Sequence, residues 1–234
     1  MNWYVLINGV GFIAAIFLLE HRLRVLPPRY SGRAYVLAVC SVPVGWLAAH
    51  LGDCVIRGLS FSQAGFAFYW GLFGAAFFYL SIGAVTLGSS MLLRTINLLI
   101  PVVVLSHAFG RIGCFFTGCC YGCSIPHTHM RIPTQLIEAG FLTILGLFML
   151  RRSSDPHPPN LTVYLIVYPA FRFLIEFLRA DDRGVIFGLS TSQFLSLPLA
   201  SLGVLALWHW WRNKNKDKSE QGAAGQPAIS TSIS

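Results

Sequence analysis

Long apolar segments separated by short polar breaks are the feature that most constrains this chain. Segments such as 5–19 and 34–51 approach or reach the roughly 20 residues that a helix needs to cross a hydrocarbon core about 30 Å thick. Such spans must be helical, because no water is available in lipid to satisfy the backbone. Hydrophobic residues make up 55% of the chain and charged residues only 11%, unlike an average soluble domain. We therefore predict an all-α polytopic membrane protein.

The apolar runs predict seven transmembrane helices. Their expected ranges are 3–20, 34–52, 65–87, 95–109, 134–150, 161–178 and 189–211. Together they form one transmembrane domain over residues 1–212. The segment 213–234 is polar and rich in Ser, Ala and Gly, and it is predicted to be a disordered cytoplasmic tail.

The lysines and arginines predict the orientation of these helices. If the N-terminus is outside, the inner segments hold eleven basic residues and the outer segments hold five. The inner residues are Arg22, Arg24, Arg29, Arg33, Arg94, Arg151, Arg152, Arg212, Lys214, Lys216 and Lys218, and the outer residues are Arg57, Arg111, Arg131, Arg179 and Arg183. The positive-inside rule then places the C-terminus in the cytoplasm. The net charge of +8 needs no nucleic-acid partner to explain it.

On this topology the unexpected polar residues face one compartment. The stretch HAFGRIGCFFTGCCYGC (107–123) lies outside, between the fourth and fifth helices, as do Asp53 and Arg131. Arg172 and Glu176 of the sixth helix are four residues apart and share a face. Because a charge at mid-helix costs about 2.5–3.5 kcal/mol on insertion scales, both should face the bundle interior. They predict a site at the outer leaflet, the alternative being an ion pair that only fixes helix packing.

The stretch 107–123 has more than one chemical interpretation. Four cysteines with nearby histidines could suggest a zinc or iron–sulfur site. These residues are Cys114, Cys119, Cys120, Cys123, His107, His127 and His129. The cysteines form one cluster instead of two separated pairs, which disfavours a metal. A disulfide on an oxidising outer face is a second alternative, and small apolar side chains that pack a tight turn are the favoured one.

The glycines and the arginine of the same stretch indicate a phosphate site. Glycine allows tight turns and close backbone approach, and the guanidinium of Arg111 is a planar fork of donors suited to phosphate. The glycines are Gly110, Gly113, Gly118 and Gly122. The combination suits a lipid headgroup, although small residues also serve helix packing in membranes.

Four ordered motifs carry a family resemblance. They are GRIGCFFTGCCYG (110–122), PTQLIE (133–138), RFLIEFLRAD (172–181) and SQFLSLP (192–198). In order and spacing they resemble the signatures of the bacterial prolipoprotein diacylglyceryl transferases. The family pattern is matched more weakly by two further segments, residues 3–4 and 68–74. The resemblance implies a multi-pass inner-membrane enzyme without a metal or cofactor. Such an enzyme moves the diacylglyceryl group of phosphatidylglycerol to the lipobox cysteine thiol of a preprolipoprotein signal peptide, and a thioether forms as glycerol phosphate leaves.

The resemblance also implies roles for single residues. Arg111 and Arg172 would hold the departing phosphate, with Glu176 orienting Arg172, and Gly122 would permit close approach of substrate. The remaining residues of the implied lipid-binding lining are Tyr4, Tyr69, Gly71, Gly110, Gly113, Cys114, Gly118, Gln135, Glu138 and Gln193.

The chain departs from the family pattern at several positions. The histidine expected before the glycines of the third helix corresponds to Tyr69, and Cys114 and Cys119 replace the usual Asn and Glu. Because His107 lies four residues before Arg111, the two would share a helix face, and we hypothesise that His107 is the missing general base. The departures leave two alternatives open: an enzyme with an anionic phospholipid and another acceptor, or a non-enzymatic lipid-binding protein.

Overall fold

A computed structural model describes residues 3–65, 68–125, 130–152, 158–180 and 185–224. The chain forms two compact units. Unit 1 comprises residues 1–119 and 135–151, and unit 2 comprises residues 120–134 and 152–234.

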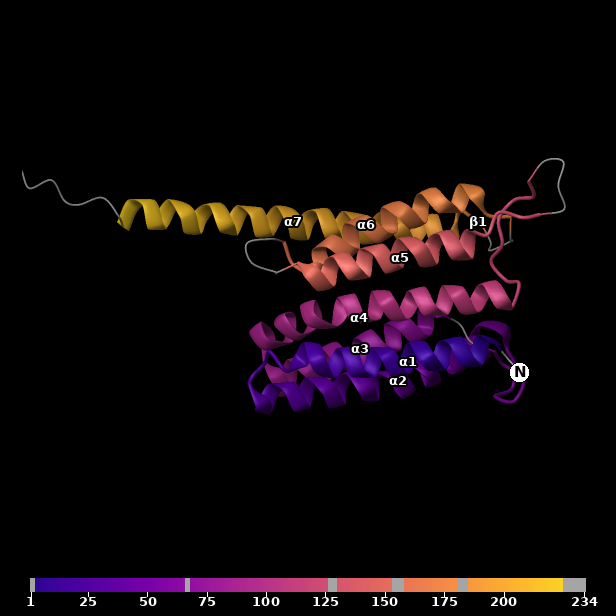
Figure 1. Cartoon of the computed structure of the whole chain (residues 1–234), viewed down its shortest axis with the longest axis horizontal. Coiled ribbons are helices and arrows are strands. Elements are labelled where there is room, and N and C mark those ends of the chain that lie inside the picture. Colours follow the sequence, from indigo (N-terminus) through magenta and orange to yellow (C-terminus); the bar gives the residue numbers. More distant parts are fainter. Residues whose placement is uncertain (1–2, 66–67, 126–129, 153–157, 181–184, 225–234) are drawn as a thin grey trace, which may run out of the picture. The chain divides into compact units, whose positions relative to one another are not determined.

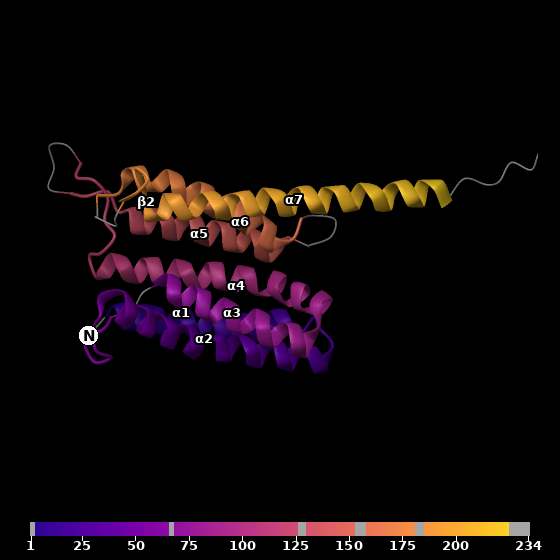
Figure 2. The ribbon, with the colours of Figure 1, turned by 180° about the vertical axis from the view of Figure 1, so that it is seen from behind.

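Unit 1 is built from five long helices. They are α1 (Trp3–Leu23), α2 (Pro28–Arg57), α3 (Phe68–Leu87), α4 (Ser89–Phe116) and α5 (Thr134–Arg151). In both ribbon views α1 lies beside α4 and α2 lies beside α3 (Figures 1 and 2). Short connections make neighbouring helices antiparallel, so the beginnings of α1, α3 and α5 share one end of the unit with the end of α4.

Small residues bring the paired helices of unit 1 together. A Cβ atom added to Gly71 of α3 would lie 2.9 Å from the Cβ of Ala49 and 3.0 Å from the carbonyl oxygen of Gly45, both on α2. A Cβ on Gly11 of α1 would lie 2.6 Å from the Cβ of Phe109 on α4. Close backbone approach of this kind is the usual device for packing helices in lipid, where no hydrophobic effect drives them together.

The buried core of unit 1 lies toward the opposite end. Its largest members are Leu19, Leu23, Leu26, Leu37, Tyr79, Leu87, Leu92 and Val102. Arginines surround this end: Arg33 donates to the carbonyl oxygen of Thr86 (3.1 Å), and Arg22 donates to that of Leu150 (3.5 Å). These side chains satisfy carbonyl groups at or near helix C-termini, which lack intrahelical partners.

Unit 2 contains two long helices joined by short elements. They are α6 (Asn160–Ile175), η1 (Glu176–Leu178), β1 (Val185–Ile186), β2 (Leu189–Ser190) and α7 (Thr191–Ala224). The two strands pair antiparallel, with Val185 opposite Ser190. The helices α6 and α7 pack closely where Gly203 meets Ile166, since a Cβ on Gly203 would lie 2.7 Å from Cγ1 of that isoleucine.

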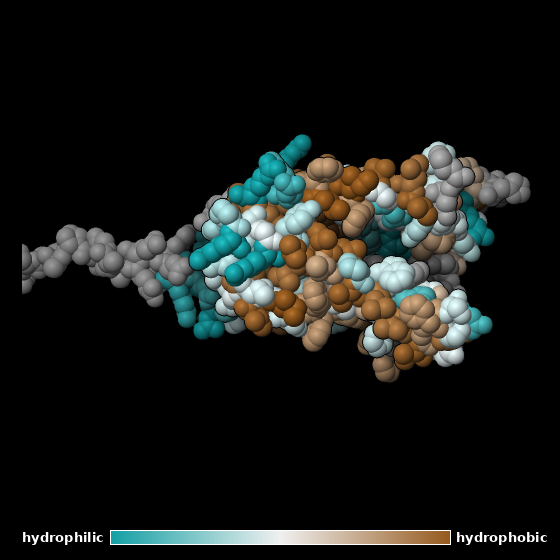
Figure 3. Space-filling view, turned by 90° about the horizontal axis from the view of Figure 1, so that it is seen from below, coloured by the Kyte–Doolittle hydropathy of each residue, from teal (hydrophilic) through white to brown (hydrophobic). Residues whose placement is uncertain are grey.

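The helices match the prediction of a polytopic membrane protein. Among the described residues, seven helices are long and apolar enough to cross a membrane. Many of their large hydrophobic side chains are exposed, including Phe77 and Val85 of α3 and Ile144 of α5. On the face drawn in Figure 3, hydrophobic side chains predominate in the middle and hydrophilic ones gather toward one end. The all-helical fold class is therefore confirmed.

Several boundaries differ from the sequence prediction, among them the C-terminal ends of α4 and α7. Helix α4 continues to Phe116 instead of ending near 109, so Gly110 and Gly113 are helical and do not form tight turns. Helix α7 continues to Ala224, so residues 213–224 of the predicted tail are helical. Lys, Glu, Gln and Ala are good helix formers, and no proline interrupts them before Pro227. The β1–β2 hairpin was not predicted, and residues 225–234 lie outside the described part of the chain.

Candidate functional site

Arg111 is the centre of the polar cluster in unit 1. Its Nε atom lies 3.1 Å from Oε1 of Glu138 on α5 and donates a hydrogen bond to Nε2 of His107, one turn earlier on α4 (3.3 Å). The side chain of Arg111 is 13% exposed and that of Glu138 only 1%. The shared helix face predicted for His107 and Arg111 is confirmed. In this contact Nε2 of His107 is the hydrogen-bond acceptor.

Gln135 lies one turn before Glu138 on α5 and is also buried. Its Nε2 donates to the carbonyl oxygen of Cys119 (2.5 Å). Its Oε1 is buried and has no hydrogen-bond partner among the described residues. A buried acceptor without a donor is unfavourable by about 1–3 kcal/mol, so this oxygen is suited to a donor that a ligand would bring.

Helix α1 approaches α4 beside this cluster. A Cβ atom on Gly113 would lie 2.5 Å from Nδ2 of Asn8 and 2.9 Å from Cδ2 of Tyr4. Asn8 in turn donates through Nδ2 to the carbonyl oxygen of Tyr4 (2.8 Å). Gly110 faces Asn8 more loosely, since its added Cβ would stand 3.8 Å from Oδ1. Gly113 thus lets Tyr4 and Asn8 lie against the helix that carries Arg111.

Arg172 is the centre of a second polar cluster, in unit 2. Its Nη1 lies 2.5 Å from Oε2 of Glu176, and its Nη2 donates to Oγ of Ser192 at the beginning of α7 (2.8 Å). Arg179 adds a second guanidinium 3.8 Å from the same carboxylate oxygen. The side chains of Arg172 and Glu176 are each 7% exposed. The ion pair predicted from the spacing of Arg172 and Glu176 is confirmed, and its burial agrees with the prediction that both avoid lipid.

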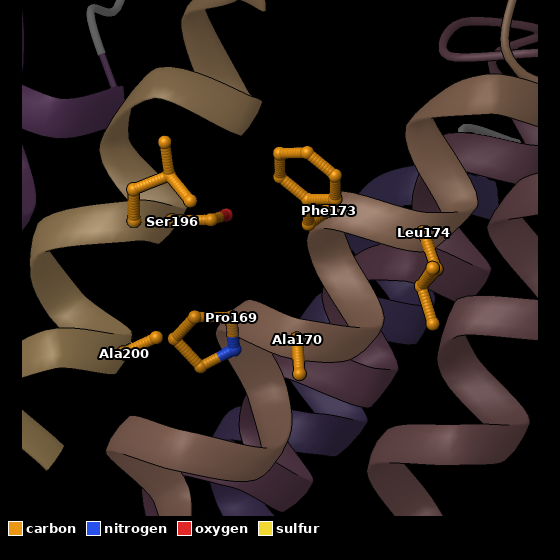
Figure 4. Close-up of a pocket in the computed structure, with 7 residues that line it drawn as sticks. Pro169, Ala170, Phe173, Leu174, Ser196 and Ala200 are labelled. Carbon is orange, nitrogen blue, oxygen red and sulfur yellow. The ribbon is translucent and has the colours of Figure 1, made fainter. Parts of the chain in front are cut away.

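An apolar groove lies in the same unit as Arg172. It encloses about 260 Å³ between α6 and α7 and is lined by Pro169, Ala170, Phe173, Leu174, Ser196, Leu197 and Ala200 (Figure 4). Phe173 follows Arg172 directly, and Ser196 lies one helical turn after Ser192, the partner of Arg172. Unit 2 therefore contains both a buried cation and an apolar groove, two features that an amphipathic lipid requires.

Gly122 and Gln193 have local structural roles. A Cβ on Gly122 would lie 2.7 Å from the carbonyl oxygen of Leu178 and 2.8 Å from that of Ile132, so the close approach is between segments of the chain itself. Gln193 forms a capping box at the beginning of α7: its Oε1 accepts from the amide of Ser190 (3.1 Å), and Oγ of Ser190 accepts from the amide of Gln193 (3.2 Å).

The other predicted site residues are scattered through the unit 1 helices and their ends. Gly71 packs against α2, Cys114 is half-buried near the end of α4, and Gly118 has a positive φ of 68°. Tyr69 belongs to α3, but its side chain lies outside the described part of the structure, as do His127 and His129.

Two contact residues were missed by the sequence interpretation. Asn8 is a polar residue in an otherwise apolar helix, four positions after Tyr4, and that spacing could have revealed it. Ser192 begins the motif 192–198, but nothing in its sequence context indicates a bond to Arg172. Glu138 was predicted only as polar lining, because the pairing of α4 with α5 cannot be read from spacing within either helix.

The family of the chain follows from comparison with known proteins. A family model described as prolipoprotein diacylglyceryl transferase matches residues 1–209. The chain belongs to this family. The resemblance predicted from four motifs is thereby confirmed over all seven membrane helices.

The chain is also similar to curated proteins that are named phosphatidylglycerol–prolipoprotein diacylglyceryl transferase. The protein from Clostridium tetani is 37% identical over 131 residues, which cover 48% of this chain and 51% of that protein. A second transferase from Clostridium perfringens is 34% identical over 68% of this chain and 66% of its own length. The Dehalococcoides mccartyi protein is 25% identical over 93% of both. The chain thus spans about half of the first relative and nearly all of the third.

Proposed function

We propose that this chain transfers the diacylglyceryl group of phosphatidylglycerol to the lipobox cysteine thiol of a prolipoprotein. Its family and the names of its relatives support this activity. The observation that carries the proposal is that Arg111 and Arg172, from two of the four family motifs, are little exposed and are each held by a carboxylate, Arg111 by Glu138 and Arg172 by Glu176. Buried guanidinium groups of fixed orientation are suited to bind a phosphate.

The reaction needs charge stabilisation at the leaving group. A thiolate attacks the glyceryl carbon that bears the phosphate, the carbon–oxygen bond breaks, and glycerol phosphate departs with the electron pair. Preorganised donors aimed at the developing charge lower this barrier most effectively in a dry site. The guanidinium groups of Arg111 in unit 1 and Arg172 in unit 2 are each a candidate for such a donor, and Glu138 and Glu176 hold their planes in place within the respective units.

His107 is proposed as the group that takes the thiol proton. Its Nε2 accepts the Nε–H of Arg111, so this hydrogen bond occupies the lone pair. A phosphate bound to Arg111 would compete for that N–H and release the lone pair for the thiol. Proton removal would then be coupled to lipid binding, because the base becomes available only when the phosphate is in place.

The groove of unit 2 is proposed to hold an acyl chain of the phospholipid. Its apolar lining comes from α6 and α7 (Figure 4), and its residues Leu174 and Leu197 are 65% and 50% exposed, so a chain can enter from the side of the helices. Burying each methylene group contributes about 0.8 kcal/mol.

The proposed orientation has the N-terminus outside, the C-terminus in the cytoplasm and the chain in the bacterial inner membrane. Within unit 1, the end opposite Arg111 carries Arg22, Arg24, Arg29 and Arg33, and basic residues favour the cytoplasmic side. The polar cluster around Arg111 would then face the outer leaflet.

A different acceptor is the second candidate, and Tyr69 favours it. This residue stands where the family pattern has a histidine, and Cys114 and Cys119 replace an Asn and a Glu. An enzyme on this scaffold could use the same anionic phospholipid with another nucleophile. A protein that binds lipid without turnover is the remaining alternative.

The deciding experiment uses the purified chain, phosphatidylglycerol with labelled acyl chains and a lipobox peptide with a free cysteine. We expect a diacylglyceryl mass gain on the peptide that Arg111→Ala and Arg172→Ala both remove. Lipid turnover without gain on the peptide would indicate another acceptor. No turnover at all, where a known transferase works under the same conditions, would reject the enzymatic proposal.

A further inference from the structure

Two thiols lie close together where α4 ends in unit 1. Cys114 is half-buried near the end of the helix, and Cys119 is exposed just beyond it. Their Sγ atoms are within 4.8 Å of each other, and neither belongs to a disulfide. Tyr4 of α1 packs beside this helix end, against Gly113, which precedes Cys114.

The backbone of the turn holds the thiols in this arrangement. The amide of Thr117 bonds to the carbonyl oxygen of Gly113 (3.2 Å), and Gly118 then reverses the chain with a φ of 68°. As a result Sγ of Cys119 points back to the carbonyl oxygen of Cys114 (3.6 Å), with Oγ1 of Thr117 3.3 Å from the same sulfur. A sulfur–sulfur bond of about 2.05 Å requires side-chain rotation and a small shift of the turn.

We propose that Cys114 and Cys119 are a redox-sensitive modification site that closes to a reversible intramolecular disulfide. The oxidant is a small-molecule disulfide. The thiolate of the exposed Cys119 attacks it to give a mixed disulfide and one small thiol. The thiolate of Cys114 then attacks the mixed disulfide at Sγ of Cys119, the protein disulfide forms, and the second small thiol leaves. Two protein thiols lose two protons and two electrons, and the oxidant gains both.

The turn that would close is connected to the polar cluster of unit 1. The carbonyl oxygen of Cys119 accepts the hydrogen bond from Gln135, which lies one turn before Glu138, the partner of Arg111. A disulfide would fix the position of this carbonyl group and with it the side chain of Gln135. The disulfide can form whether or not the chain catalyses the proposed transfer reaction. Only an effect of the disulfide on the transfer rate rests on the proposed function.

The test uses the purified full-length chain, treated with a chelator so that bound metal cannot mask thiols. The protein is incubated with oxidised glutathione, remaining thiols are alkylated, and peptides are mapped by mass spectrometry. We expect a peptide containing Cys114 and Cys119 that lacks two hydrogen atoms and both alkyl groups, and that regains them after reduction with dithiothreitol. Mapping the wild-type chain decides the question without a variant that could misfold.

Variants sharpen the assignment. Cys114→Ser and Cys119→Ser should each abolish the cross-linked peptide, whereas Cys40→Ser and Cys54→Ser, both on α2, should leave it unchanged. Glutathione adducts that persist on Cys119 without ring closure would overturn the proposal, as would cross-links that join either thiol to Cys120 or Cys123 instead. Because the readout is a mass and not a rate, failure of the transfer assay would leave this result intact.

Discussion

At the scale of single residues, Arg111 and Arg172 are each accompanied by a glutamate. An isolated guanidinium in a dry interior is unfavourable by several kcal/mol, and a carboxylate at hydrogen-bond distance offsets much of this. Glu138 and Glu176 therefore make it feasible to keep Arg111 and Arg172 buried before any phosphate arrives. The two carboxylates are positioning groups, because each acts on an arginine.

Replacing Glu138 tests this role. We expect Glu138→Gln to destabilise the chain by about 3 kcal/mol, because it leaves the buried charge of Arg111 without its partner. The measurement is unfolding monitored in detergent or bicelles. Glu20→Gln is the matched control, since Glu20 pairs with Arg24 over 2.7 Å but both side chains are at least half exposed. Such a surface pair contributes roughly 0–1 kcal/mol. Equal effects of the two substitutions would contradict the assignment.

The general base is tested at His107. We expect His107→Gln to lower the rate of transfer by roughly 100-fold or more, the range of general base catalysis, while Tyr69→Phe leaves transfer intact. Both rates are measured with the lipobox peptide assay at saturating lipid. Full activity of His107→Gln would end the hypothesis, and loss of activity in Tyr69→Phe alone would transfer the proton role to the tyrosine.

At the scale of helices, the close approach of α1 to α4 depends on one glycine. Gly113→Ala would place a methyl group 2.5 Å from Nδ2 of Asn8, so Asn8 and Tyr4 must move. We expect this substitution to lower the melting temperature and to weaken lipid binding. Gly110→Ala on the same helix is the matched control for stability, because its methyl group has room and alanine favours helix by about 0.5–1 kcal/mol. A higher melting temperature for both variants would show that α1 is not tightly packed here.

The pairing of α6 with α7 can be tested through their groove. Ala200→Trp should fill the groove and raise KM for phosphatidylglycerol with long acyl chains roughly tenfold. A tenfold change corresponds to a loss of about 1.4 kcal/mol of binding free energy, about what is expected if two methylene groups of the acyl chain are no longer buried. Lipid with short acyl chains should be affected less. Leu202→Trp, on an exposed part of α7 outside the groove lining, is the control. An unchanged KM for Ala200→Trp with both lipids would exclude the groove as an acyl site.

How far the sequence predicts these elements depends on whether their cause is local. The apolar runs placed all seven helices, because the length of a span is a property of one segment. The extension of α4 through Gly110 and Gly113 could not be predicted, since it depends on the contact with Tyr4 and Asn8 of α1. The Arg172–Glu176 pair was predicted from its spacing within one helix, whereas the bond between Arg172 and Ser192 joins two helices and left no local pattern.

At the scale of the whole molecule, the distribution of basic residues predicts how the chain is inserted. Eleven of the lysines and arginines assigned to a side fall on the proposed inner side and five on the outer side, and this bias sets orientation during insertion. The extension of α7 to Ala224 keeps Lys214 and Lys216 on a helix that continues beyond its apolar part. Both lysines would then lie at the inner surface, where anionic lipids attract them.

The orientation is tested with fusions to reporters that work on only one side of a bacterial inner membrane. Alkaline phosphatase fused after Leu59, between α2 and α3, should be active, and the same enzyme fused after Gly88, between α3 and α4, should be inactive. Green fluorescent protein fused after Ser234 should fluoresce, because it folds in the cytoplasm. The opposite pattern would invert the topology and place the polar cluster of Arg111 on the cytoplasmic side. Since lipobox cysteines would then have to be modified before translocation, that result would also favour an acceptor other than an exported lipoprotein.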